Sequence, residues 1–328
     1  MVGCTGVGSL PGTDFPAAAR LVMDVLGGAD GGIPHLPELP ARGPWASMVG
    51  RGTAVLTELP AELAAGEWRL SDHPGVDQRR ARATLRDDLD RFQEDAHDYT
   101  GTVKLQVVGP WTLAAALFLP LGGRVLGDRA ARRDLAQSLA DGVLELLAQT
   151  RRRLPSATLL LQVDEPALPA VLTGAVPTEG GYFRHRSVRP PEVAEALRPL
   201  ADAAAAGVLH CCAPGLPLDL VGAAGFTAAS VDQDMIADLD VLAEAVDGGL
   251  GLYLGCLPTS LPVRESRPDD LVRRVLGLLR PLELGPALAD RLVLTPACGL
   301  AGFSPPQALA ALAALRRASG LVDEALRH

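Results

Sequence analysis

Residues 158–163, Thr-Leu-Leu-Leu-Gln-Val, decide the fold because they form a short apolar run between two long helical patterns. The first pattern covers 128–154, the second covers 191–206, and both are rich in Ala, Leu and Arg. A run of this length, ended by Asp-Glu-Pro, is typical of a strand that is buried on both faces of a parallel sheet. The stretch therefore predicts one strand in a series of βα units.

The same alternation continues on both sides of this strand. Six further apolar runs predict strands over 3–9, 103–108, 207–211, 227–232, 251–256 and 292–296. Further helical patterns cover 16–26, 239–246, 268–279 and 305–318. An eighth run, 31–37, predicts a weaker strand, since Pro34 and Pro37 lack the N–H that a central strand donates.

Eight βα units predict an α/β fold, a (β/α)8 TIM barrel that forms a single domain over 1–328. The segment 45–99 separates the second and third predicted strands and is too long for a simple crossover. We expect it to be an inserted helical or hairpin segment after the second strand, not a second domain.

Composition excludes several classes of protein. Hydrophobic residues make up 48% of the chain and charged residues 21%, which excludes a disordered or collagen-like chain. The net charge of −9, without a basic stripe, argues against nucleic-acid and membrane partners. Lys104 is the single lysine, so a lysine-bearing phosphate loop is excluded. Five cysteines, an odd number, and the lack of an N-terminal leader pattern favour a reducing cytoplasm.

The carboxyl ends of the later predicted strands are unusually polar. His210, Cys211 and Cys212 end one run, Asp232 ends the next, and Cys256 and Cys298 follow the last two. Barrel active sites are assembled at these ends. Because residues i and i+2 of a strand face the same way, His210 and Cys212 can bind one ion while Cys211 turns away.

Two thiols, one imidazole and one carboxylate form a tetrahedral donor set that suits Zn²⁺. The candidate ligands are His210, Cys212, Cys298 and Asp232, with Cys256 as the alternative to Asp232. A zinc ion with an open position lowers the pKa of a bound thiol, which prepares that thiol to attack a carbon electrophile. The reaction class that follows is thiol alkylation.

Other readings of these cysteines stay open. Each cysteine alone is more often a small core residue than a ligand. Cys211, Cys256 and Cys298 could also be redox thiols with no metal.

Two further clusters carry chemistry. Asp164 and Glu165 end the strand quoted above, where one carboxylate could hold an amino group or both could belong to an acidic turn. Gly6-Val7-Gly8-Ser9 ends the first run, where backbone N–H groups could bind a carboxylate, although such a short glycine motif is usually a turn.

The ordered set of motifs resembles the C-terminal catalytic barrel of cobalamin-independent methionine synthase. Val7-Gly8-Ser9-Leu10-Pro11 resembles the family's Ile-Gly-Ser-Phe-Pro, and 162–168 resembles its Gln-Ile-Asp-Glu-Pro-Ala-Leu. His210-Cys211-Cys212 and 296–300 match its His-x-Cys and Pro-Asp-Cys-Gly-Leu zinc motifs. The remaining matches are His35 to Glu38 with Met48-Val49, Val103-Lys104, and Gly109-Pro110-Trp111-Thr112.

The resemblance implies a residue-by-residue assignment. It implies that His210, Cys212 and Cys298 bind zinc, with Asp232 where the family has a glutamate ligand. It further implies that Ser9 and its neighbours Val7 and Gly8 hold the carboxylate of homocysteine. The amino group is then held by Glu38 and Asp164. The expected reaction is methyl transfer to the homocysteine thiol, which forms methionine.

Four departures from the family pattern concern the methyl donor. Ala116 and Ala170 stand where the family has a folate-stacking tryptophan and a folate-binding glutamate, and the N-terminal barrel of the long enzyme is missing. Cys256 takes the catalytic place of a histidine that protonates the departing folate, and a thiol is a poorer acid. We therefore expect another donor, such as a methyl-corrinoid carried by a partner protein, whose leaving group needs no proton. The alternatives are transfer of another alkyl group to a small thiol, as in the related coenzyme M transferases, and a noncatalytic protein that binds zinc or a thiol amino acid.

Overall fold

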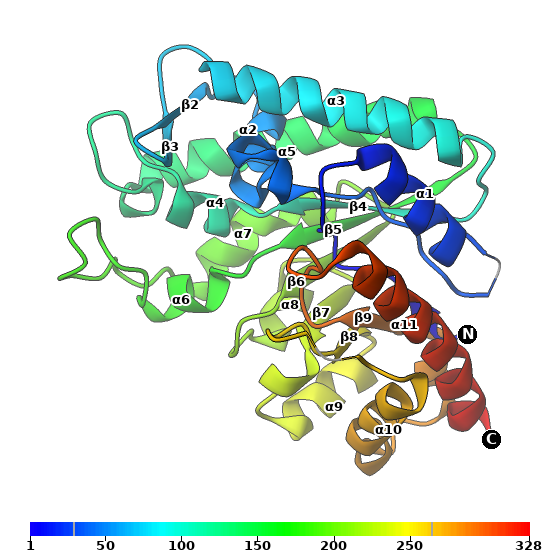
Figure 1. Ribbon diagram of the computed structural model, residues 1–328. Coiled ribbons are helices and arrows are strands. Elements are labelled where there is room, and N and C mark those ends of the chain that lie inside the picture. The colour runs from blue at the N-terminus through cyan, green and yellow to red at the C-terminus, as the bar shows by residue number, and fades with distance from the viewer. Residues whose placement is uncertain (29, 264) are drawn as a thin grey trace.

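Seven parallel strands form a curled sheet in the computed structural model, which describes residues 1–28, 30–263 and 265–328 (Figure 1). The order of the strands is β1-β9-β8-β7-β6-β5-β4. Their bounds are β1 Gly3–Cys4, β4 Thr102–Val108, β5 Thr158–Asp164, β6 Ala206–Cys211, β7 Ala228–Asp232, β8 Gly251–Leu257 and β9 Leu292–Pro296. The alternation of strands and helices predicted from the sequence is confirmed.

Residues 32–38 fill the space between β1 and β4 and close the sheet into a barrel. Isolated parallel bridges join Cys4 to Gly32 on one side and His35 to Lys104 on the other. Ile33 donates its N–H to the Cys4 carbonyl, and Leu36 donates to the Lys104 carbonyl. The strand predicted over 31–37 is therefore replaced by single bridges, because the two prolines interrupt the donor pattern. The strand predicted over 3–9 is regular only at Gly3–Cys4.

Helices cover the outside of the barrel. Their bounds are α1 Phe15–Leu26, α4 Pro110–Ala116, α5 Arg129–Arg153, α6 Leu168–Thr173, α7 Pro190–Ala201, α8 Leu218–Ala223, α9 Leu239–Asp247, α10 Pro268–Leu279 and α11 Pro305–Arg327. The helix predicted over 305–318 continues to Arg327. The one predicted over 191–206 ends at Ala201, because Ala206 already begins β6.

The insertion contains both a hairpin and helices. It consists of the short 3-10 turns η1 Pro40–Arg42 and η2 Pro44–Ala46, helix α2 Met48–Val55, the hairpin β2 Ala61–Ala64 and β3 Glu67–Leu70, and helix α3 Val76–Ala96. Helix α3 contacts both α1 and α2, so the insertion packs against the first helix of the barrel (Figure 1).

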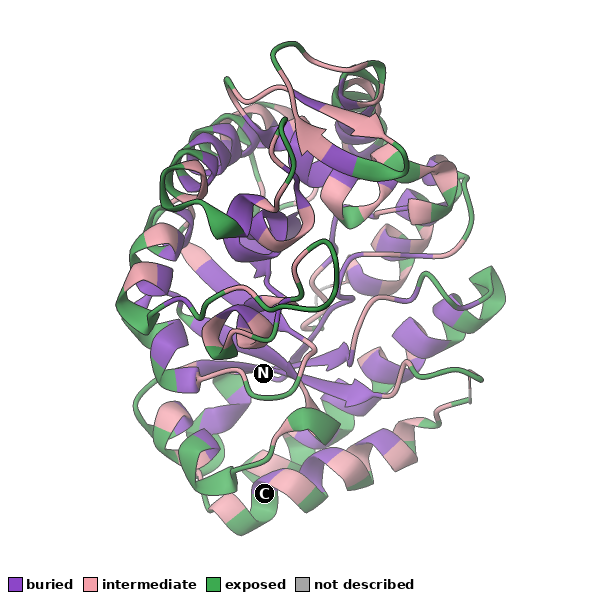
Figure 2. Cartoon of the chain, turned by 90° about the vertical axis from the view of Figure 1, so that its left-hand side faces the viewer, coloured by how far each residue is buried: buried purple, intermediate pink, exposed green. Residues whose placement is uncertain are grey.

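Strand alternation separates two layers of the interior. Leu159, Leu161 and Val163 of β5 belong to the large core between the sheet and the helices. Leu160 faces the barrel lumen, where it packs with Val208, Ala228, Tyr253 and Val293. The strands at the centre of the molecule are coloured as buried over most of their length in Figure 2. Gln162 and Asp164 follow Leu160 along β5 at intervals of two residues, and His210 follows Val208 along β6 in the same way. These polar side chains therefore also face the lumen, at the carboxyl ends of the two strands.

Among the described residues, none of the helices combines the length and the apolar character that a membrane span requires.

Candidate metal and amino-acid site

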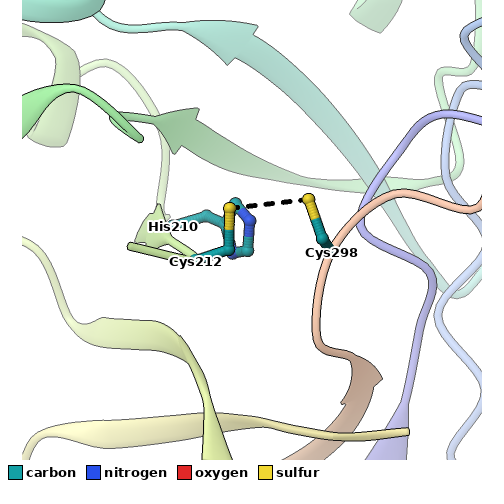
Figure 3. Close-up of side chains that lie close together, drawn as sticks. All are labelled: His210, Cys212 and Cys298. Atoms are coloured by element: carbon teal, nitrogen blue, oxygen red, sulfur yellow. Dashed lines mark hydrogen bonds between the residues drawn. The ribbon is translucent and has the colours of Figure 1, made fainter. Parts of the chain in front are cut away.

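His210, Cys212 and Cys298 meet at the carboxyl ends of β6 and β9 (Figure 3). One ligand atom from each of the three lies within 4.8 Å of the other two. The Sγ atoms of Cys212 and Cys298 are 3.5 Å apart, although 86 positions separate the residues in sequence. The barrel brings Cys212 and Cys298 together because β6 and β9 both end at the same rim.

The geometry of these donors fits zinc. Two sulfur ligands at about 2.3 Å from a tetrahedral ion lie about 3.8 Å apart, close to the observed separation of 3.5 Å. His210 Nδ1 lies 2.9 Å from the Ser230 hydroxyl on β7, which orients the ring and leaves Nε2 for an ion. Among residues 1–28, 30–263 and 265–328 the group has these three members, so a tetrahedral ion would keep one position for a further ligand.

The two thiols differ in electrostatic environment. The adjacent Cys212 thiol and then the His210 imidazole lower the pKa of Cys298 to about 4. Contact with Cys298, followed by burial, raises the pKa of Cys212. The contact thus lowers the pKa of one thiol and raises that of the other, and a cysteine binds a cation as the thiolate.

Asp232 lies beside this group but is not a member of it. Its carboxylate accepts a hydrogen bond from the Asp234 N–H at 2.9 Å and so begins the short 3-10 turn η4 Gln233–Met235. Burial raises the pKa of Asp232, and the nearby Cys298 contributes in the same direction.

Cys256 does not reach the group either. It lies at a bulge in β8, between Gly255 and Leu257, and packs fully buried in the core between sheet and helices. Burial raises the pKa of this thiol to about 12. Cys256, predicted as the alternative fourth ligand and as the catalytic residue, therefore lies in the outer layer and not in the group of His210, Cys212 and Cys298. Cys211 is likewise buried.

Ser9 and Glu38 lie next to each other at the closing seam of the barrel. Their backbones form a parallel bridge, in which Glu38 donates its N–H to the Gly8 carbonyl and Leu10 donates to the Glu38 carbonyl. Leu300 donates its N–H to the Ser9 carbonyl, so the loop that carries Cys298 runs along the same segment. A Cβ on Gly299 would lie 1.9 Å from Ser9 Oγ, which explains why glycine follows Cys298.

Asp164 faces the lumen on the other side of the site. It pairs in register with His210 on the neighbouring strand. Gln162 donates to Asp164 Oδ1 at 2.6 Å and to the Val7 carbonyl at 2.9 Å. Lys104 Nζ donates to the same carbonyl at 2.7 Å. Burial raises the pKa of Asp164 and lowers that of Lys104.

Glu165 has a structural position. It is fully buried, and its carboxylate accepts hydrogen bonds from the Trp111 N–H, the Thr112 N–H and the Thr112 hydroxyl at 2.9, 2.7 and 2.6 Å. It therefore caps the beginning of α4. Of the two carboxylates at the end of β5, only Asp164 is directed to the site.

The structure adds two residues that the sequence did not indicate. Gln106 of β4 donates to Glu38 Oε1 at 3.2 Å. Arg51 of α2 places its Nε 3.1 Å from the same oxygen. Neither residue lies at a strand end next to a motif, so only the spatial arrangement reveals them.

Comparisons with known proteins give the family and the fold of the chain. Residues 102–320 match the family model described as cobalamin-independent synthase, catalytic domain. No match was found among curated proteins. A solved structure of a B12-independent methionine synthase from Shewanella sp. W3-18-1, in complex with selenomethionine, is similar in fold, with a TM-score of 0.66. The alignment covers 99% of each chain at 14% sequence identity.

Proposed function

Since this chain belongs to the cobalamin-independent synthase catalytic-domain family, we propose that it is a zinc-dependent methyltransferase that methylates the thiol of homocysteine. The observation that carries this proposal is the proximity of His210, Cys212 and Cys298, whose ligand atoms lie within 4.8 Å of one another. Asp164 lies beside His210 in register, and Ser9 lies beside Gly299, so polar groups for an amino acid surround this cluster.

The residues would bind a zwitterionic thiol at three points. Ser9, with the backbone of Val7 and Gly8, is the proposed partner of the substrate carboxylate. Glu38 and Asp164 are the proposed partners of its ammonium group. His210, Cys212 and Cys298 would hold the zinc, and Asp232 remains the candidate for a fourth ligand that the substrate thiol could replace.

Zinc bound here would lower the pKa of the substrate thiol and so supply a thiolate at neutral pH. The substrate sulfur then forms a bond to the methyl carbon, the bond between that carbon and the donor breaks, and its electron pair leaves with the donor. Glu38 and Asp164 would hold the amino group so that the sulfur points at the metal.

The donor end of the site supports a methyl donor other than the usual folate. Ala116 ends α4 and Ala170 lies in α6. At these two positions the family has a tryptophan that stacks on folate and a glutamate that binds it. The buried thiol of Cys256 offers no proton to a departing nitrogen. A methyl-corrinoid, carried by a partner protein, leaves as reduced cobalt and needs no proton.

The test is a parallel assay of donors with one thiol. The purified protein is incubated with homocysteine and either methylcobalamin or methyltetrahydrofolate triglutamate, and methionine is measured by mass spectrometry. We expect methionine from the corrinoid and little from the folate. The Cys298→Ser variant should be inactive, whereas Cys211→Ser, a buried neighbour outside the cluster, should keep activity.

Efficient turnover with the folate and no corrinoid would overturn the proposal that the methyl donor is a corrinoid. Tight binding of homocysteine without turnover from any methyl donor would overturn the proposed methyltransferase activity and favour a protein that binds homocysteine without catalysis.

A further inference from the structure

Glu38 is held by an arginine that comes from the insertion and not from the barrel. Arg51 lies in α2, and its Nε is 3.1 Å from Glu38 Oε1. Both side chains are largely buried, with relative exposures of 8% for Arg51 and 12% for Glu38. Water screens such a pair weakly, so the contact restricts where the carboxylate can point.

Arg51 is itself fixed by a second carboxylate. Its Nη1 donates to Asp88 Oδ2 of α3 at 3.1 Å. Arg42 donates to both oxygens of Asp88 at 2.8 and 2.7 Å. The charges therefore alternate along a chain from Arg42 through Asp88 and Arg51 to Glu38. Only the last member belongs to the proposed amino-acid site.

The contacts to Glu38 leave one of its oxygens for a ligand. Gln106 Nε2 and Arg51 Nε both approach Oε1, at 3.2 and 3.1 Å. Among the described residues, no hydrogen bond goes to Oε2. The arrangement at Asp164 is similar, because Gln162 donates to Oδ1.

The two carboxylates also share a cavity. Glu38, Arg51, Gln106 and Asp164 are the polar members of the lining of one small cavity, whose other lining residues are mainly apolar and whose volume is about 10 Å³. That is about the space of a single water molecule. An ammonium group donates three hydrogen bonds and is of similar size, and Glu38 and Asp164 are the two carboxylates among the lining residues.

We propose that Arg51 is a positioning residue that sets the specificity for an α-amino thiol by fixing the free oxygen of Glu38 toward the ammonium group. The inference rests on the proposed function, because it assumes that Glu38 binds the substrate amine. It gives the insertion a role in the site: α2 carries Arg51, and α3 carries the aspartate that holds it. Arginine suits this role because its planar guanidinium can donate to two carboxylates in fixed directions.

The test compares homocysteine with 4-mercaptobutanoate, which has the same thiol and carboxylate but no amino group. Calorimetry on the zinc-loaded protein gives the ratio of the two dissociation constants. We expect Arg51→Met to lower the preference for homocysteine by roughly tenfold or more, with unchanged zinc content. Arg51→Lys should give an intermediate loss, because an ammonium cannot contact Glu38 and Asp88 in the same directions.

A double-mutant cycle separates positioning from general damage. Glu38→Gln should remove the preference for homocysteine over 4-mercaptobutanoate. Adding Arg51→Met to this variant should not change the ratio of the two dissociation constants further. Arg42→Met is the matched control, because Arg42 contacts Asp88 but not Glu38, and it should keep the preference.

Each outcome decides between the claims. If the unmodified protein binds both thiols equally, the assignment of the amino-acid site fails and the role of Arg51 fails with it. If the protein prefers homocysteine and Arg51→Met keeps or increases that preference, only the role of Arg51 is overturned. A loss that persists in the Glu38→Gln background would also overturn it.

Discussion

At the scale of single residues, the site depends on side chains that neighbour one another across strand ends. Ser230 is such a neighbour: it lies on β7 and contacts His210 Nδ1 at 2.9 Å. Partners of this kind fix the ring and the tautomer of a histidine ligand, and their loss typically weakens metal binding by about 10- to 100-fold.

Ser230→Ala should therefore weaken zinc binding by about tenfold or more, measured by competition with a chromogenic chelator. Ser319→Ala removes a buried hydroxyl from α11, far along the chain, and should leave the zinc affinity unchanged. Equal affinities in the Ser230 variant and the unmodified protein would mean that His210 is not oriented through this contact.

Gly299 allows Ser9 to approach the zinc loop, since a Cβ there would lie 1.9 Å from Ser9 Oγ. Gly299→Ala should displace Ser9 and weaken homocysteine binding by about tenfold while the metal is retained, a loss equivalent to about 1.4 kcal/mol. Gly302→Ala is the control on the same loop, because its Cβ would be in ordinary contact with Leu261 at 3.8 Å. Unchanged binding in Gly299→Ala would argue against Ser9 as a substrate contact.

Sequence reasoning reached the residues that stand in motifs at strand ends. It predicted that His210 and Cys212 share a face two residues apart, and the structure brings Cys298 to them. Cys256 lies in the outer core with Leu252 and Leu254, because alternate residues of β8 face the same layer and Tyr253 faces the lumen. Sequence reasoning could not find Arg51, whose partners lie 13 and 37 positions away in other elements.

At the scale of elements, α4 is a helix of seven residues whose start depends on the buried Glu165. Glu165→Ala would leave two backbone N–H groups and one hydroxyl without their acceptor. We expect the free energy of unfolding to fall by about 3 kcal/mol, measured in denaturant. Glu195→Ala, an exposed residue of α7, is the matched control and should change it by less than about 0.5 kcal/mol. Equal stabilities of the two variants would mean that α4 does not need this cap.

Element positions were largely predictable, and element ends were less so. The apolar run 292–296 is β9 without any change of bounds. Helix α11 extends nine residues beyond its predicted end at 318. Leu315, Ala318 and Val322 are buried and continue the face that packs against the barrel. Periodicity shows which face is buried but not how far a neighbouring element will cover it.

At the scale of the whole molecule, the insertion is tied to the barrel by buried charges. Asp88 of α3 has a side-chain exposure of 3% and pairs with both Arg42 and Arg51. Asp88→Asn would leave the buried guanidinium of Arg51 and the half-buried one of Arg42 with a weaker acceptor. The expected loss of stability is about 3 kcal/mol, accompanied by faster proteolysis within 40–99.

The control for this variant lies on the same helix. Asp90 pairs with Arg153 but is 54% exposed. Asp90→Asn should therefore cost less than about 1 kcal/mol. If the two variants are equally stable, the buried chain of charges does not hold the insertion in place.

The barrel and its insertion follow from the alternation of apolar runs and helices, whereas the chain of charges does not. Arg42 and Arg51 are single charges among Gly, Pro and apolar residues, and Asp88 lies in a charged pattern that resembles any solvated helix surface. Their burial arises only when α2 and α3 pack together, which periodicity in one segment cannot indicate.

Elemental analysis of the purified protein gives the sharpest check on zinc as the ion that activates the thiol. We expect about one zinc per chain, reduced to a small fraction in Cys298→Ser and retained in Cys211→Ser. A protein that carries no zinc after purification and binds none when supplied, or a Cys298→Ser variant with full zinc occupancy, would contradict it.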